Sequence, residues 1–216
     1  NIITPVPQHI VWGDETLDTS DGLRLYIDAA AEDVERLEAA AHHTGIKLKS
    51  SRRPAHSGYL NLAISENIIG AEAYTLDITH EGVSITSSTA AGLYYGLQSL
   101  TQIYAALGTL QECHIEDAPR FAYRGILIDI SRHFRTKEFL MRQIDMMAHL
   151  KMNRLHLHLT DAAGWRLEIE RYPRLMELAA WRADSLWKDW AANGCRYVQQ
   201  GTESAYGGYY TKEQVR

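Results

Sequence analysis

The chain has 216 residues, of which 45% are hydrophobic and 23% are charged, proportions typical of a globular protein with one large or two modest domains. Its formal net charge of −5 provides no basic stripe that would follow a phosphate backbone, which argues against nucleic acid as a partner. No apolar run reaches the roughly 20 residues that cross a bilayer, so no membrane span is predicted.

The amino terminus and the two cysteines say little about cellular context. The opening segment NIITPVPQHI has neither the charged nor the apolar region of a signal peptide, so it is either a processed mature end or an artificial boundary. Cys113 and Cys195 are too few for a disulfide scaffold. We interpret them as two free thiols, with a disulfide or a catalytic thiol as the alternatives.

Residues 1–117 have the pattern of an α+β domain. Alternating apolar and polar residues predict strands in LRLYIDAA and GYLNLAIS, and the break at Glu81-Gly82 predicts a hairpin between two further strands. Two amphipathic helices are predicted, in AAEDVERLEAAAHHTG and in AAGLYYGLQSLTQIYAALG, the second capped by Thr89 and ended by Gly108. We therefore predict an antiparallel sheet covered by two helices.

Pro119 marks the predicted linker to a second domain, residues 118–216. A buried strand in GILIDI, a helix, and a second strand in RLHLHL form a predicted β-α-β unit, which implies parallel strands. Such a unit belongs either to an open doubly wound sheet or to a (β/α)₈ barrel. The apolar face of its helix comprises Leu140, Ile144, Met147 and Leu150, with Thr136 as its cap.

Arg132 and Asp161 stand just beyond these two consecutive strands. The carboxyl ends of parallel strands meet at one edge of a sheet, where functional residues gather, so we expect the two side chains at the same mouth. An arginine fork suits hydroxyls or carboxylates, and a carboxylate orients a histidine or accepts a sugar hydroxyl. A structural salt bridge between strand ends is the alternative.

The strand RLHLHL places His156 and His158 on one face and its leucines on the other. Two histidines at this spacing are able to bind a metal, but no third ligand is recognisable. An inward-facing polar layer near a site explains them equally well, and we predict neither metal nor cofactor.

Several segments of the second domain, in order, resemble glycoside hydrolase family 20, the β-N-acetylhexosaminidases. They are APRFAYRGILIDISRHF, KMNRLHLHLTDAAGWRLEIERYPRL, AAWR and YGGYYTKEQVR. The softer motifs EAYTLDIT and AAGLYYGLQSLTQI resemble the α+β domain that precedes the barrel in that family. The resemblance implies a TIM barrel, a secreted or periplasmic parent enzyme, and a glycan substrate with a terminal N-acetylhexosamine.

By this resemblance Arg132 would bind hydroxyls of the terminal sugar, and Asp161 would belong to a hydrogen-bonded relay that supports the general acid. The usual wording after that aspartate is Asp-Gln-Gly-Trp, whereas this chain has AAGW at 162–165. The departure removes two polar side chains beside the site, while Gly164 and Trp165 are kept. The family cleaves with retention, and the substrate's own acetamido group is the nucleophile.

That chemistry needs an adjacent Asp-Glu pair after a later strand, and no such pair follows a strand of the predicted barrel here. The acidic neighbours are Asp14-Glu15, Glu32-Asp33 and Glu116-Asp117, all predicted in or beside the first domain. The residues from Pro119 onward are fewer than half of the about 250 in a complete barrel. We therefore predict an inactive amino-terminal fragment, truncated after two strands and one helix of the barrel, with an open edge covered by the remaining chain or an oligomer.

Two other interpretations stay open. The missing acid pair favours a non-catalytic carbohydrate-binding or interaction module, whereas an unrelated nucleotide-binding protein is disfavoured because no glycine-rich phosphate loop follows either strand. Trp181, Trp187 and Trp190 lie in a long aromatic segment, and each is expected either to stack on sugar or to pack within its loop. YYTKEQVR predicts a helix start, with Thr211 and Gln214 spaced as a capping box.

Overall fold

The structure is a computed structural model that describes residues 2–216. The chain divides into two compact units. The first extends to Ala122 and includes the short segment His149–Lys151, and the second comprises Tyr123–Ala148 and Met152–Arg216. Among the helices of residues 2–216, none is both long and apolar enough to cross a membrane.

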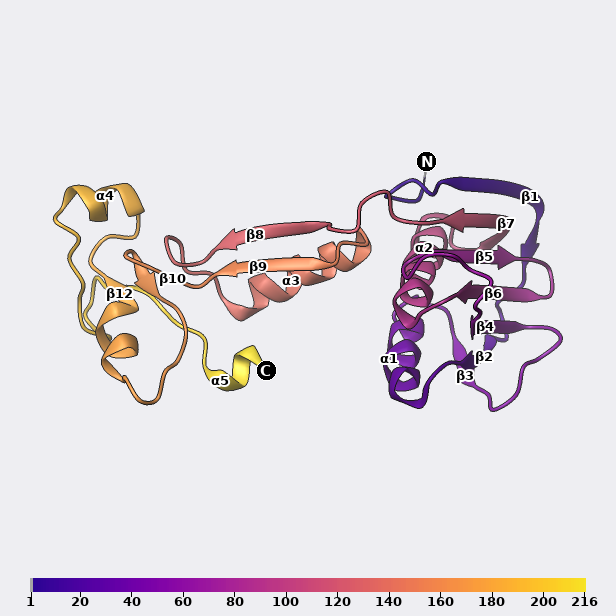
Figure 1. The fold of residues 1–216 in the computed structure, drawn as a ribbon, viewed down its shortest axis with the longest axis horizontal. Helices are drawn as coiled ribbons and strands as arrows, with labels where there is room; N and C mark the ends of the chain where they lie inside the picture. Colours follow the sequence, from indigo (N-terminus) through magenta and orange to yellow (C-terminus); the bar gives the residue numbers. More distant parts are fainter. Residues whose placement is uncertain (1) are drawn as a thin grey trace. The chain divides into compact units, whose positions relative to one another are not determined.

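The first unit is built on one seven-stranded sheet with the strand order β1-β7-β5-β6-β4-β2-β3 (Figure 1). The strands are β1 (His9–Leu17), β2 (Leu23–Asp28), β3 (Leu48–Ser50), β4 (Tyr59–Ile64), β5 (Tyr74–Ile78), β6 (Gly82–Ser87) and β7 (Leu110–Asp117).

The sheet is mixed, so the prediction of an antiparallel sheet was wrong for half of it. Strands β1, β7, β5 and β6 pair antiparallel, and β5 and β6 form the hairpin expected at Glu81-Gly82. Strands β6, β4, β2 and β3 pair parallel instead. The parallel pairs join strands that are separated by a helix or a long excursion, and the local alternation of apolar residues does not report such pairing.

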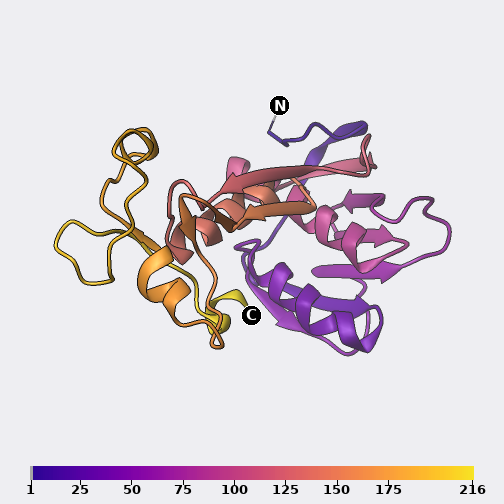
Figure 2. The ribbon, with the colours of Figure 1, turned by 60° about the vertical axis from the view of Figure 1, so that its left-hand side comes forward.

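Two helices cover this sheet, as predicted. Helix α2 (Ala90–Leu107) packs on β4 to β7, and α1 (Ala31–His42) packs on β2 and on α2, beside which it lies (Figure 2). The Thr89 hydroxyl accepts a hydrogen bond from the Gly92 amide, and Gly108 ends α2 in the left-handed region at φ 69°, so both predicted helix ends are confirmed. Apolar side chains from the helices and the sheet form one buried core.

The second unit begins with the predicted β-α-β unit. Strands β8 (Gly125–Asp129) and β9 (Arg154–His158) pair parallel, and α3 (Lys137–His149) connects them. The shorter elements that follow are β10 (Thr160–Asp161), β11 (Gly164–Trp165), the π-helical turn η1 (Leu175–Ala179), β12 (Trp181–Arg182), α4 (Trp187–Ala192), β13 (Tyr206–Gly207) and α5 (Lys212–Val215). The capping box of Thr211 and Gln214 starts α5.

Helix α3 covers one face of the β8–β9 pair, and the other face is more exposed. Ile128, Leu157 and Leu159 pack with Leu140 of α3, and α3 runs alongside the strands in Figures 1 and 2. Leu127 belongs to the other face and is 57% exposed. Residues Asp129, His156 and His158 share that face by alternation.

The expected buried face of α3 is only partly correct. Leu140 and Met147 are buried, but Ile144 is 42% exposed. A repeat of apolar residues identifies a helix face, but it does not identify what covers that face.

Candidate functional site

Arg132 and Asp161 meet where β8 and β9 end. Arg132 lies three residues beyond β8, and Asp161 lies three residues beyond β9. The Arg132 Nη2 atom donates to the Asp161 Oδ2 atom at 2.8 Å, so the two predicted site residues are brought together as a pair. Strand alternation and the carboxyl-end rule were sufficient to predict this placement.

Two further side chains complete the cluster. The Asp129 carboxylate accepts from the Arg132 Nη1 atom at 2.6 Å and from the Arg132 amide at 3.1 Å. His158 Nε2 lies 3.1 Å from Asp161 Oδ2, and the Asp161 Oδ1 atom accepts from the Ala162 amide at 2.6 Å. Arginine thus stands between two carboxylates, and one of those carboxylates also holds a histidine. We call these four side chains the Arg132–Asp161 cluster.

The cluster is open to solvent and strongly polar. The side chains of Arg132 and Asp161 are 38% and 33% exposed. The hydrogen bond from the Ala162 amide, aided by the charge of Arg132, lowers the pKa of the Asp161 carboxyl. Partial burial acts to raise the pKa of Asp129, but hydrogen bonds from Arg132 outweigh it and that pKa is lowered. The hydrogen bond to Asp129 raises the pKa of Arg132. Both carboxyls are therefore ionised at neutral pH.

A buried arginine that was not predicted from the sequence contacts both of the loops that carry the cluster. Arg166 is fully buried, and its guanidinium donates to backbone carbonyls of several segments. The acceptors are the carbonyls of Ile130 (3.1 Å), Ser131 (2.8 Å), Ala163 (3.4 Å), Ala180 (2.5 Å) and Gly208 (3.1 Å). Burial and the nearby Arg182 lower the pKa of Arg166 to about 10, so it carries its charge at neutral pH.

Glycines make the room that this guanidinium occupies. A Cβ atom on Gly164 would lie 2.1 Å from the Arg166 Nη2 atom. Gly207 has φ +153° and approaches the Ala180 carbonyl oxygen so closely that an added Cβ atom would lie 1.9 Å from it. In the sequence, this arrangement corresponds to the motifs GWR and YGG. The first contains Gly164 and Arg166, the second contains Gly207, and neither motif alone indicates a space for a buried arginine.

The AAGW departure leaves the loop held through its backbone. The Tyr197 hydroxyl donates to the Ala162 carbonyl, and the Ala163 carbonyl faces both Arg166 and Arg182. These contacts need no polar side chain at either alanine. The half-buried Trp165 donates its indole Nε1 to the Leu167 carbonyl at 2.6 Å. The substitution therefore changes the surface beside Asp161 while the loop keeps its anchors.

The tryptophans of the long aromatic segment do different things. Trp190 is buried and donates to the Arg196 carbonyl, and Trp181 donates to the Met176 carbonyl, so both pack within their own loops. Trp187 is 41% exposed. Neither cysteine is in a disulfide, and they lie apart in environment, Cys113 buried and Cys195 exposed.

A metal centre finds no support in the part of the chain that the structure describes. Residues 2–216 contain no group of three or more potential ligands arranged for a metal ion. His158 contacts Asp161 rather than His156, its partner in the two-histidine motif.

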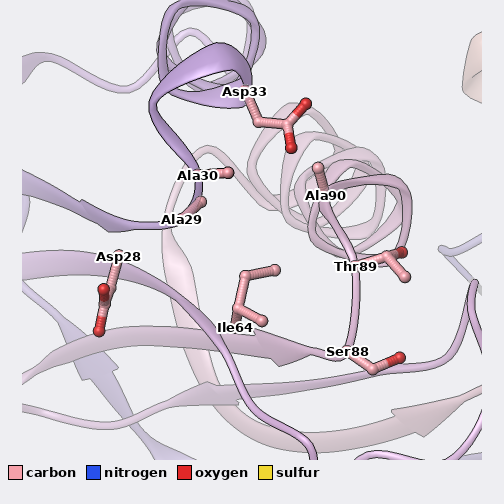
Figure 3. A pocket seen from close by; sticks show the side chains of 8 residues that line it. All are labelled: Asp28, Ala29, Ala30, Asp33, Ile64, Ser88, Thr89 and Ala90. Carbon is pink, nitrogen blue, oxygen red and sulfur yellow. The ribbon is translucent and has the colours of Figure 1, made fainter.

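A pocket lies in the first unit, where α1 and α2 begin (Figure 3). Its lining residues are Asp28, Ala29, Ala30, Asp33, Ile64, Ser88, Thr89 and Ala90. Helix N-termini favour anions, but the carboxylates of Asp28 and Asp33 oppose an anion here. This pocket therefore supports no specific ligand.

Two family models match the chain. Residues 1–118 match domain 2 of glycosyl hydrolase family 20, and residues 121–216 match the catalytic domain of the same family. The chain belongs to glycosyl hydrolase family 20. The resemblance expected from the sequence motifs is confirmed.

Relatives of this family 20 chain carry consistent names. An N,N'-diacetylchitobiase of Vibrio harveyi is 32% identical over 97% of this chain and 24% of its own length. A solved exo-β-N-acetylglucosaminidase of the same organism, in complex with N-acetylglucosamine, aligns with a TM-score of 0.75 and 31% identity over 99% of this chain and 33% of that one. A β-N-acetylhexosaminidase of Streptomyces coelicolor has a TM-score of 0.74 and 31% identity over 99% and 42%. The chain spans about a quarter of the length of this chitobiase and of two curated β-hexosaminidases that it also matches.

Proposed function

We propose that this chain forms part of an exo-acting, retaining β-N-acetylhexosaminidase. Residues 1–118 would be the family's domain 2, and residues 121–216 would be the first part of the catalytic barrel. The substrate would be a glycan with a terminal N-acetylglucosamine or N-acetylgalactosamine. The observation that carries the proposal is the Arg132–Asp161 pair at the carboxyl ends of adjacent parallel strands, in a chain of glycosyl hydrolase family 20. The names of the relatives supply the reaction class.

Arg132 is suited to bind the hydroxyls of a terminal sugar. Two of its guanidinium N–H groups are directed at Asp129 and Asp161, which fixes the plane of the fork. The Arg132 side chain is 38% exposed at the strand ends, where a sugar would enter. A fork held in this way donates to hydroxyls without losing further side-chain entropy.

Asp161 would act through His158 rather than on the sugar bond itself. Its Oδ2 atom touches both Arg132 and His158, and its lowered pKa keeps it a hydrogen-bond acceptor. A carboxylate in this position selects the histidine tautomer with a proton on Nε2. We assign it to a relay that supports the general acid, which would come from a later strand.

Catalysis itself would be substrate-assisted, with the acetamido oxygen attacking the anomeric carbon. The acid pair this requires is not among the acidic neighbours of the chain, which are Asp14-Glu15, Glu32-Asp33 and Glu116-Asp117. All three pairs lie in the first unit, and none of them follows β8 or β9 in the chain. We therefore propose that the 216-residue chain binds but does not hydrolyse, and that hydrolysis needs a longer protein of the size of the relatives.

An assay with a nitrophenyl β-N-acetylglucosaminide tests this proposal. We expect turnover from a protein that extends this chain to the length of its relatives, and background rates from the 216 residues alone. Turnover by the 216 residues that an N-acetylglucosamine-thiazoline inhibitor abolishes would show that a catalytic pair had been missed. An extended protein without turnover would favour the second candidate, a carbohydrate-binding module, which the lack of a suitable acid pair also supports.

A further inference from the structure

Arg166 is hydrogen-bonded to both of the loops that carry Arg132 and Asp161. Its Nε and Nη2 atoms donate to the carbonyls of Ile130 and Ser131, which immediately precede Arg132. The Nη2 atom also reaches the Ala163 carbonyl, two residues beyond Asp161, at 3.4 Å. One rigid, planar group therefore contacts the backbone on both sides of the Arg132–Asp161 pair.

We propose that Arg166 is a positioning residue that sets the separation of Arg132 and Asp161 by binding the backbone of both their loops. The inference rests on the proposed function, because the pair matters for catalysis only if it binds sugar. The effect of Arg166 on the geometry of the pair, however, can be measured without any enzyme activity.

The arrangement requires an arginine rather than any buried cation. Five N–H donors in a fixed plane reach carbonyls from several directions at once, whereas a lysine ammonium has three donors at a single point. Within residues 2–216, Arg166 donates its side-chain hydrogen bonds to backbone carbonyls, and the Phe134 ring lies 5.7 Å from its guanidinium carbon. No carboxylate contact is seen there that a lysine would preserve as an ion pair.

The backbone around Arg166 is shaped for the guanidinium. Ser131, which precedes Arg132, is fully buried, and its hydroxyl donates to the Gly164 carbonyl at 2.8 Å, so the two loops are also bonded to one another. At Gly164 any side chain would displace the Arg166 Nη2 atom, which is the atom shared by both loops. Substitution of Gly164 therefore perturbs the contact while Arg166 itself remains.

Arg182 provides a matched control. It is equally buried and also donates to carbonyls, but its main acceptors are Asp184 at 2.7 Å and Ser185 at 2.6 Å, within its own loop. It contacts the Ala163 carbonyl at 3.4 Å, the same distance as Arg166, but none of its hydrogen bonds goes to Ile130 or Ser131, so it does not connect the two loops. Loss of a buried arginine fork is common to both substitutions, whereas loss of the link between the loops is specific to Arg166.

The test compares Arg166→Lys, Gly164→Ala and Arg182→Lys in the 216-residue chain by NMR. We expect Arg166→Lys and Gly164→Ala to raise the titration midpoint of Asp161 toward that of an ordinary carboxyl, and to accelerate exchange of the Arg132 guanidinium protons by roughly 10-fold. Arg182→Lys should leave both readouts as in the parent chain.

A second arm measures kinetics in the extended protein. We expect kcat/KM to fall by roughly 10- to 100-fold in Arg166→Lys, and by less than about 3-fold in Arg182→Lys. If the extended protein lacks hexosaminidase activity altogether, the proposed function fails while the NMR arm still decides the positioning role.

Two results would overturn the inference. One is a folded Arg166→Lys chain in which Asp161 titration and Arg132 exchange are unchanged. The other is loss of all tertiary structure of the second unit in both Arg166→Lys and Gly164→Ala, because Arg166 would then hold the unit together rather than set one distance.

Discussion

A buried ion pair in the first unit gives the sharpest stability prediction. The Lys151 ammonium lies 2.8 Å from the Asp117 Oδ2 atom and 2.7 Å from the Tyr74 hydroxyl, and it stands over the Tyr74 ring at 4.9 Å. The side chains of Lys151 and Asp117 are 9% and 13% exposed. The Tyr74 hydroxyl further contacts Ser99 at 2.7 Å. Removing the lysine charge would leave a nearly buried carboxylate without its cation.

We expect Lys151→Met to lower the free energy of unfolding of the first unit by about 3 kcal/mol, the lower end of the range for breaking a buried pair. The lower end applies because Asp117 keeps hydrogen bonds from the Tyr74 hydroxyl and, at 3.3 Å, from the Gln8 amide. Methionine fills most of the volume of the lysine stem. Lys151 has φ 55°, and the backbone cost of that conformation is common to both residues.

Unfolding in urea is monitored by hydrogen exchange of the amides in β5, so that the signal comes from the first unit. A double-mutant cycle with Asp117→Asn should give a coupling of about 2 kcal/mol. Glu15→Gln is the control in the same unit, because its contact with His80 is exposed and should contribute below about 1 kcal/mol. A Lys151→Met effect as small as that of the control would refute the reasoning, since the pair would then behave as a surface ion pair.

Three further results are expected. Leu97→Ala in α2 should destabilise the first unit by about 3 kcal/mol in a urea melt, because Leu97 is fully buried in the main core, and an effect below 1 kcal/mol would contradict that packing. The lowered pKa values of Asp129 and Asp161 mean that their interactions stabilise the second unit above the ordinary carboxyl value of 3.8 and are lost as pH falls through the lowered values. Urea melts of Asp161→Asn and the parent chain should therefore differ at pH 7 and converge near pH 2, whereas a difference independent of pH would exclude an ionic origin. Hydrogen exchange should be slower in β5 than in β8, whose Leu127 face is open, and equal protection would contradict this order.

Local rules predicted the two helices of the first unit, the β-α-β unit and the meeting of Arg132 with Asp161. The helix ends at Thr89 and Gly108 follow from capping chemistry, which depends on a few adjacent residues. The placement of Arg132 and Asp161 follows from one β-α-β unit, whose hand and direction are nearly invariant. Such features need no knowledge of distant contacts.

Features that depend on distant backbone were not predictable in the same way. The parallel pairing of β2 with β4 joins strands separated by a helix and a third strand, and nothing in either strand's pattern names its neighbour. Arg166 stands in an alternating segment that resembles an exposed strand, and its partners are carbonyls, which every residue has. An arginine that pairs with an aspartate has a partner of opposite charge that is recognisable in the sequence. For an arginine that pairs with backbone carbonyls, the only sequence signal is the glycines that make room for it.

The role of Arg132 in sugar binding is tested most directly by the kcat/KM of Arg132→Ala for a nitrophenyl β-N-acetylglucosaminide, measured in the extended protein. Loss of charged hydrogen bonds to the sugar should lower kcat/KM by roughly 100-fold. Arg135→Ala is the control on the same loop, because the Arg135 side chain stacks on the Phe139 ring at 5.3 Å, and it should retain kcat/KM within about 3-fold. An Arg132→Ala protein that matches the Arg135→Ala control would contradict the assignment of this cluster as the sugar site.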